Sequence, residues 1–231
     1  MTFKAKIEAS EIERLSVAEF GGEICVIDHI SEEYFKAVEY LKKQKILGFD
    51  TETKPTFTAN ERRNRVALLQ LSGADKAFIF RLIKLGIPDD LAKILSNARI
   101  KKVGAAVHDD IRGLQHYKQF VAKGFVDLQK IGKDYGIEEK SVRKMAGIIL
   151  NLRVSKSQQL SNWESNELSH GQIQYAAIDA WACREMYVKL IAEKAKVEEN
   201  PKAKVEENPK AKVEEKPNTK AKAKQKETIC Q

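Results

Sequence analysis

The order of strand-like and helix-like segments limits this chain to a small number of folds. Three apolar segments typical of strands follow one another at 45–53, 65–72 and 76–82, and only the turn-like GAD separates the last two. Further strand-like segments, at 100–107 and 124–128, are separated by segments of helical periodicity. Neighbouring strands that can pair antiparallel, followed by strands joined through helices, predict an α/β fold with a mixed sheet flanked by helices.

Helical patterns lie before, between and after these strands. The segment 31–44 carries an apolar stripe, and 88–97 opens with a proline and two acids, as a helix start should. Ser169 with Gln172 three positions later fits a capping box, which predicts that the last helix begins there. One further strand and the remaining predicted helices lie at 21–28, 109–117, 138–150 and 170–194.

The end of the chain repeats a polar octapeptide. AKVEENPK at 195–202 recurs at 203–210 and returns in degenerate form at 211–218. A proline in each repeat interrupts a helix, and one valine per repeat buries too little apolar surface to offset the entropy of ordering. We therefore expect one folded domain at 1–194 and a Lys/Glu/Pro tail at 195–231 that is disordered or frayed helix.

Composition narrows the class of protein and the kind of partner. A hydrophobic content of 42% can form a core, but no apolar run reaches the roughly 18 residues of a membrane-spanning helix. The three cysteines, Cys25, Cys183 and Cys230, form no CxxC pair, so we expect reduced thiols and a cytoplasmic protein. The formal net charge of +8 suits a polyanionic partner such as nucleic acid.

Two carboxylates lie at the end of the most strand-like segment. In GFDTET, Asp50 and Glu52 are two positions apart, so on a strand they project from the same face. Like charges at this spacing raise each other's pKa unless a cation lies between them, and Mg²⁺ or Mn²⁺ prefers such oxygen ligands. A metal site is one interpretation of the pair, and a solvent-exposed strand end is the other.

Two later segments add carboxylates that could join this pair. In VGAAVHDDIRGL a strand is expected to turn into a helix, where Asp110 shares a helix face with Leu114, so we expect Asp110 to point inward and Asp109 to cap the helix. In the last helix, Tyr175 and Asp179 are four positions apart among small residues. A buried Asp179 would need a partner, whereas an exposed Asp179 beside a core tyrosine is the alternative.

The segments FDTET, VGAAVHDDIRGL and YAAIDA resemble, in order and spacing, the three motifs of the DEDD superfamily of 3′–5′ exonucleases, in the subgroup with tyrosine in the third motif. This group includes RNase D, the proofreading domain of A-family DNA polymerases and the Werner-type exonuclease domain. The resemblance extends over roughly residues 20–192 and implies a ribonuclease H-like fold. The catalytic residues that it implies are Asp50, Glu52, Asp110, Tyr175 and Asp179.

The resemblance also implies a mechanism, in which two Mg²⁺ or Mn²⁺ ions about 3.5–4 Å apart assist phosphodiester hydrolysis. All four carboxylates would be metal ligands. Asp50 would bridge both ions, Glu52 and Asp179 would complete the site at which water is activated, and Asp110 would act at the second ion, mainly through bound waters. Tyr175 would orient the attacking water, because an ordinary pKa near 10 makes tyrosine a poor base at neutral pH.

Substrate contacts are expected from side chains next to Asp50 and Glu52 on the same strand, or in nearby loops. The threonines on either side of Glu52 would meet the terminal nucleotide. A phenylalanine in the following loop is a candidate wedge at the 3′ end, with a core position as the alternative. The arginines before the second strand of the three are candidates for phosphate contacts, with a solvated basic loop as the alternative. The candidate substrate-binding residues are Thr51, Thr53, Phe57, Arg62, Arg65 and Lys156.

The expected function is therefore a metal-dependent 3′–5′ exonuclease that acts on DNA rather than RNA. An RNase D-like exoribonuclease and a non-catalytic nucleic-acid-binding domain are the two alternatives. The presence of all four carboxylates and of Tyr175 argues against the binding domain. Clustered acids repel phosphate, so they add nothing to a surface that only binds nucleic acid.

Overall fold

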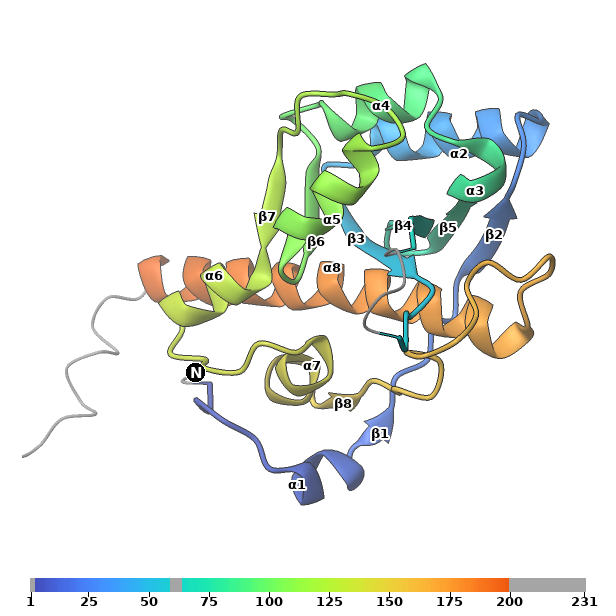
Figure 1. The fold of residues 1–231 in the computed structure, drawn as a ribbon. Coiled ribbons are helices and arrows are strands. Elements are labelled where there is room, and N and C mark those ends of the chain that lie inside the picture. Colours follow the sequence, from blue (N-terminus) through green and yellow to red (C-terminus); the bar gives the residue numbers. More distant parts are fainter. Residues whose placement is uncertain (1–2, 59–63, 200–231) are drawn as a thin grey trace, which may run out of the picture. The chain divides into compact units, whose positions relative to one another are not determined.

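A six-stranded mixed sheet lies at the centre of the fold in the computed structural model, which describes residues 3–58 and 64–199 (Figure 1). The strand order is β2-β5-β4-β3-β6-β7. The strands are β2 (Glu23–Ile27), β3 (Ile46–Thr53), β4 (Val66–Ser72), β5 (Lys76–Arg81), β6 (Lys101–Gly104) and β7 (Phe125–Asp127). The pairs β3–β4 and β4–β5 are antiparallel, while β2–β5, β3–β6 and β6–β7 are parallel. The predicted α/β fold and the predicted antiparallel run of three strands are confirmed.

Helices cover both faces of this sheet. One core cluster joins α2, α3, α4 and α5 to one face, and α8 lies across the other (Figure 1). A second cluster joins α6 and α7 to α8. The helices are α1 (Ala9–Glu13), α2 (Glu32–Lys43), α3 (Leu82–Leu85), α4 (Asp89–Leu95), α5 (Val107–Gln115), α6 (Leu128–Asp134), α7 (Val142–Leu150) and α8 (His170–Glu199). A small parallel pair, β1 (Ser16–Val17) and β8 (Leu152–Arg153), completes the described elements.

The two faces of β3 have different neighbours. Leu47 and Phe49 are fully buried in the core beneath α2, α4 and α5. The alternate residues, beginning with Gly48, face α8, and a Cβ on Gly48 would lie 1.8 Å from the backbone oxygen of Ala180. Only glycine permits this approach, so Gly48 and the small residues of α8 together bring the helix directly onto β3.

The start of α8 agrees with the sequence pattern. The Ser169 backbone N–H donates to the Gln172 side chain at 2.9 Å, and the Gln172 backbone N–H donates to the Ser169 hydroxyl at 3.2 Å. These reciprocal bonds are the predicted capping box, and the helix begins at the next residue.

The end of α8 lies beyond the predicted domain boundary. The boundary between 194 and 195 falls inside this helix, which continues to Glu199. Residues 200–231 lie outside the described part of the chain, so the disordered tail stays a prediction. In the described ranges, no helix is long and apolar enough to span a membrane, and Cys25 and Cys183 are free thiols.

Candidate active site

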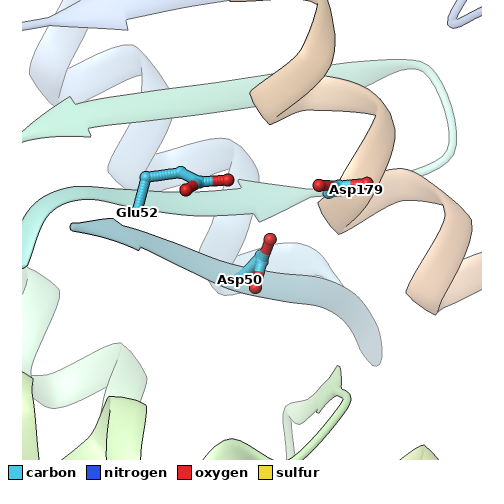
Figure 2. Close-up of side chains that lie close together, drawn as sticks. All are labelled: Asp50, Glu52 and Asp179. Atoms are coloured by element: carbon cyan, nitrogen blue, oxygen red, sulfur yellow. The ribbon is translucent and has the colours of Figure 1, made fainter. Parts of the chain in front are cut away.

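Three of the predicted metal ligands meet between β3 and α8. Asp50 and Glu52 project from β3, and Asp179 projects toward them from α8 (Figure 2). One carboxylate oxygen from each residue lies within 4.8 Å of those of the other two. The alternatives of a solvated strand end and an exposed Asp179 are wrong, because Asp179 is buried and the two β3 acids are partly buried.

The electrostatics of this cluster are those of carboxylates without a counter-charge. Burial raises the pKa of Asp50 well above its ordinary value, and the nearby charges of Asp179, Glu52 and Asp110 raise it further. The pKa values of Glu52 and Asp179 are also raised, in each case chiefly by burial. Within the described ranges, no lysine or arginine forms an ion pair with these acids.

This donor set fits a hard divalent cation. Carboxylate oxygens are the ligands that Mg²⁺ and Mn²⁺ prefer, and a bound cation would relieve the repulsion that raises the three pKa values. The cluster thus has both the ligand chemistry and the missing positive charge that a metal site requires.

Asp110 approaches the cluster from α5 and points inward, as predicted. The Thr51 hydroxyl donates to its Oδ1 at 2.5 Å, and burial raises the pKa of Asp110 to about 6. Asp110 does not belong to the group of three converging carboxylates, but its charge raises the pKa values of Asp50 and Glu52. Asp109 points outward, with 90% of its side chain exposed and an ion pair to Arg112 at 3.6 Å.

The prediction that Asp109 caps α5 is wrong. The N-cap is Ala106, which has a left-handed backbone (φ 56°), and Asp109 is the third residue of the helix. The Ala106 N–H donates to the Asp127 carboxylate at 3.1 Å, so a group on β7 satisfies the backbone at this turn. Sequence reasoning placed the cap at an acid because alanine carries no capping signal.

Tyr175 lies one helical turn before Asp179 on α8, so the two side chains share one face of the helix. Burial raises the pKa of Tyr175, and the charges of Asp179, Glu52 and Asp50 raise it further. Its ring packs against buried Trp163, with the ring centroids 5.8 Å apart. The phenol therefore stays protonated at neutral pH, which agrees with an orienting role and not with a basic one.

The predicted substrate-binding residues have different surroundings. Thr51 is engaged with Asp110, so the structure gives it a neighbour within the site rather than a free hydroxyl. Phe57 is 79% exposed, and the alternative of a core position is wrong. Lys156 is exposed in the segment between β8 and α8. Arg62 lies outside the described residues, so its predicted contact remains untested.

Thr53 and Arg65 line a groove that begins where β3 ends. Its volume is about 860 Å³, and its walls come from the segment after β3, the start of β4 and α5. The Arg65 guanidinium lies 4.7 Å from the centre of the Tyr117 ring and donates to the His116 backbone oxygen.

Sequence reasoning missed the other basic residues of this groove. Lys54 follows directly after β3, and Arg112 and His116 lie four positions apart on α5, which is the spacing of one helix face. That spacing was the available signal, but it did not show that this face of α5 borders the end of β3.

Comparisons with known proteins agree with this geometry. A family model described as 3′-5′ exonuclease matches residues 25–193. The chain is 35% identical over 150 residues to exonuclease 3′-5′ domain-containing protein 2 of Drosophila melanogaster, covering 63% of this chain and 25% of that protein. It is 28% identical over 197 residues to the bifunctional 3′-5′ exonuclease/ATP-dependent helicase WRN of Mus musculus, covering 81% of this chain and 14% of that protein. The chain thus spans a quarter or less of the length of these two relatives.

Solved structures show the same fold at low identity. The EXO domain of Aedes aegypti Nibbler superposes with a TM-score of 0.68 at 22% identity, covering 78% of this chain and 94% of that domain. Escherichia coli RNase D superposes with a TM-score of 0.66 at 20% identity, covering 78% of this chain and 48% of that one. The predicted ribonuclease H-like fold is confirmed.

Proposed function

Because this chain belongs to the 3′-5′ exonuclease family, we propose that it is a metal-dependent exonuclease that removes nucleotides from the 3′ ends of nucleic acids, with DNA preferred over RNA. The observation that carries this proposal is the convergence of Asp50, Glu52 and Asp179 within 4.8 Å, at the positions that the exonuclease motifs single out. The non-catalytic alternative has no use for one buried and two partly buried acids that repel one another.

Asp50, Glu52 and Asp179 would hold the cation or cations, with Asp110 beside them. When bound, Mg²⁺ or Mn²⁺ polarises the phosphate and lowers the pKa of a bound water. Asp50 and Glu52 lie on a central strand, and Asp179 lies on a helix that packs tightly against it. Their positions are therefore closely fixed, as catalysis requires.

Tyr175 would act on the attacking water. Its raised pKa keeps the phenol protonated, so it can hold a water in place by hydrogen bonding but cannot deprotonate it at neutral pH. Its position one helical turn before Asp179 places Tyr175 beside the carboxylate cluster.

The basic groove gives the substrate strand a path to these residues. Thr53 lines the groove and is the next residue but one after Thr51, with the metal ligand Glu52 between them. We therefore propose that the 3′ end lies at the carboxylates and that phosphates further up the strand contact Lys54, Arg65 and Arg112. Phe57 would meet a base near the end of the strand through its exposed ring.

RNA is the second candidate substrate. The fold is similar to that of RNase D, including a Trypanosoma brucei RNase D solved in complex with RNA (TM-score 0.64, 19% identity). A 2′-hydroxyl is read by contacts around the terminal ribose, and a likeness at this identity concerns the fold alone.

The test is digestion of matched single- and double-stranded DNA and RNA oligonucleotides, each labelled at the 5′ or the 3′ end in turn. We expect a ladder of 5′-labelled products that shortens from the 3′ end with Mg²⁺ or Mn²⁺, and none with EDTA or in the Asp50→Asn variant. Binding without product under either metal would favour the non-catalytic domain. Faster digestion of RNA than of DNA would reverse the substrate order.

A further inference from the structure

Gln70 lies beside the carboxylate cluster with no hydrogen-bond partner. It is the residue of β4 directly opposite Asp50 in the β3–β4 ladder. Its side chain is only 1% exposed. In the described part of the chain, neither its amide nitrogen nor its amide oxygen makes a hydrogen bond. A buried amide with both polar atoms unpaired is rare in folded proteins, so this one needs an explanation.

Gln70 shares its face of the sheet with the metal ligands. Leu69 and Leu71 enter the core beneath α2, whereas Leu68 packs with Ala176 of α8. Alternation along β4 therefore places Gln70 on the face toward α8, which is the face of Asp50.

Asp50 is the polar neighbour that the ladder brings within reach. The residue opposite Gln70 on its other side is Ile79 of β5, which offers no polar group. Cβ atoms of directly opposite residues in an antiparallel pair are about 4.5–5.5 Å apart, a distance that a glutamine amide spans easily. The Asp50 carboxylate is thus the natural acceptor for the Gln70 side-chain N–H.

We propose that Gln70 is a positioning residue for the metal site: its amide donates a hydrogen bond to the Asp50 carboxylate when that carboxylate binds a divalent cation. This inference rests on the proposed function only in that Asp50 is a metal ligand. A ligating carboxylate is held in orientation by donors to its remaining lone pairs, and loss of such a donor weakens metal binding.

The chemistry of the side chain suits this role. A lysine or arginine at this position would neutralise Asp50 and compete with the cation, and a leucine would offer no donor. Glutamine supplies a donor without charge, so it orients the ligand and leaves the negative charge of the cluster available to the metal.

The test is a Mn²⁺ titration of the EDTA-treated, dialysed full-length protein, followed by the EPR signal of free Mn²⁺. In Gln70→Met, which conserves length and apolar packing, we expect the dissociation constant for Mn²⁺ to rise by about 10- to 100-fold. The melting temperature without metal should not fall, because the substitution removes two unpaired buried polar atoms. Turnover should drop at limiting Mn²⁺ and recover in part at high Mn²⁺, which loss of structure alone would not produce.

Ser72→Ala is the matched control. Ser72 is buried on the same strand and the same face, but it is opposite Gly48 instead of a carboxylate, and its hydroxyl donates to the backbone oxygen of Gly73. We expect its Mn²⁺ binding to equal that of the unmodified protein. Gln70→Asn, which keeps the amide but shortens its reach, serves if Gln70→Met does not fold and should also weaken binding.

A measurement on the unmodified protein does not depend on any variant. The side-chain ¹⁵N–¹H₂ signals of Gln70, followed by NMR during a Mg²⁺ titration, should shift in step with metal occupancy. Unmoved signals, or unchanged Mn²⁺ binding in a folded Gln70 variant, would overturn the inference. If Mn²⁺ binding depends on Gln70 but no nucleic acid is digested, the proposed function is wrong and the inference about Gln70 stands. If nucleic acid is digested but Mn²⁺ binding does not depend on Gln70, the inference fails alone.

Discussion

Asparagine at position 110 should stabilise the metal-free protein while it impairs the enzyme. The side chain of Asp110 is buried beside Thr51, and its pKa is raised from an ordinary 3.8 to about 6, chiefly by burial. One pKa unit corresponds to about 1.4 kcal/mol, so the ionised carboxylate costs the fold roughly 3 kcal/mol at pH 7 and above. The substituted amide would carry no charge and would still accept the hydrogen bond from Thr51.

The net gain in the free energy of unfolding should be smaller than this cost of the ionised carboxylate. The asparagine N–H₂ needs a partner of its own, so we expect a free energy of unfolding higher by about 1–3 kcal/mol. For a domain of this size, about 2–4 °C of melting temperature corresponds to 1 kcal/mol, which gives a rise of roughly 2–12 °C.

The gain should depend on pH in a defined direction. Because the folded state holds the Asp110 proton more tightly than the unfolded state, Asp110 makes the unmodified protein less stable as the pH rises from about 4 to about 6. Below pH 4 the carboxyl is protonated in both states and the contribution vanishes. The difference in melting temperature between Asp110→Asn and the unmodified protein should therefore increase from pH 4 to pH 7.

The assay is thermal unfolding in EDTA over this pH range, repeated with saturating Mn²⁺, together with turnover on a labelled oligonucleotide. Mn²⁺ should stabilise the unmodified protein more than the variant, because only the former keeps all four acids. Asp109→Asn is the matched control: its side chain is 90% exposed, so it should change stability by less than about 0.5 kcal/mol and leave turnover nearly intact. A pH-independent difference, or the larger effect at position 109, would refute the reasoning.

Four further outcomes are expected. Asp50→Ala should abolish cleavage and leave the circular dichroism spectrum unchanged; near-normal turnover would contradict the metal assignment. Tyr175→Phe should lower kcat by about 10²-fold, the usual effect of losing one hydrogen-bond donor at a reaction centre, with Mn²⁺ binding preserved by EPR. Gly48→Ala should lower the free energy of unfolding by about 1–3 kcal/mol and lower turnover, because its Cβ would lie 1.8 Å from the backbone of α8. Gly21→Ala is the control, because a Cβ on Gly21 would meet nothing within 4 Å. Removing 200–231 should leave kcat unchanged at saturating substrate and lower the slope of log affinity against log salt by no more than about 2, since its 5 glutamates partly offset the charge of its 9 lysines.

Periodicity predicted the elements that carry a clear apolar pattern. The strands β4 and β5 are buried along almost their whole length, β3 is buried over its first half, and α2 buries one face. The bounds of all four agree with the predicted segments to within a few residues. The inward direction of Asp110 followed from its helical phase with Leu114, which is fully buried. These features depend on local spacing, which the sequence states directly.

Features that depend on distant partners were not predicted. The left-handed turn at Ala106 is stabilised by Asp127 from another strand, and the pair β1–β8 joins segments far apart in the sequence. The position of Gln70 opposite Asp50 also required the register of β4 on β3. The basic groove likewise required the position of α5 beside the end of β3.

The division of the carboxylate cluster between β3 and α8 has a consequence for biosynthesis. Asp50 and Glu52 emerge from the ribosome early, whereas Asp179 comes from the last helix of the described chain. Domains tend to fold as units during synthesis, so a nascent chain that ends before α8 would lack both the third acid and the helix that packs on Gly48. A copy of the chain that ends before α8 should therefore be inactive.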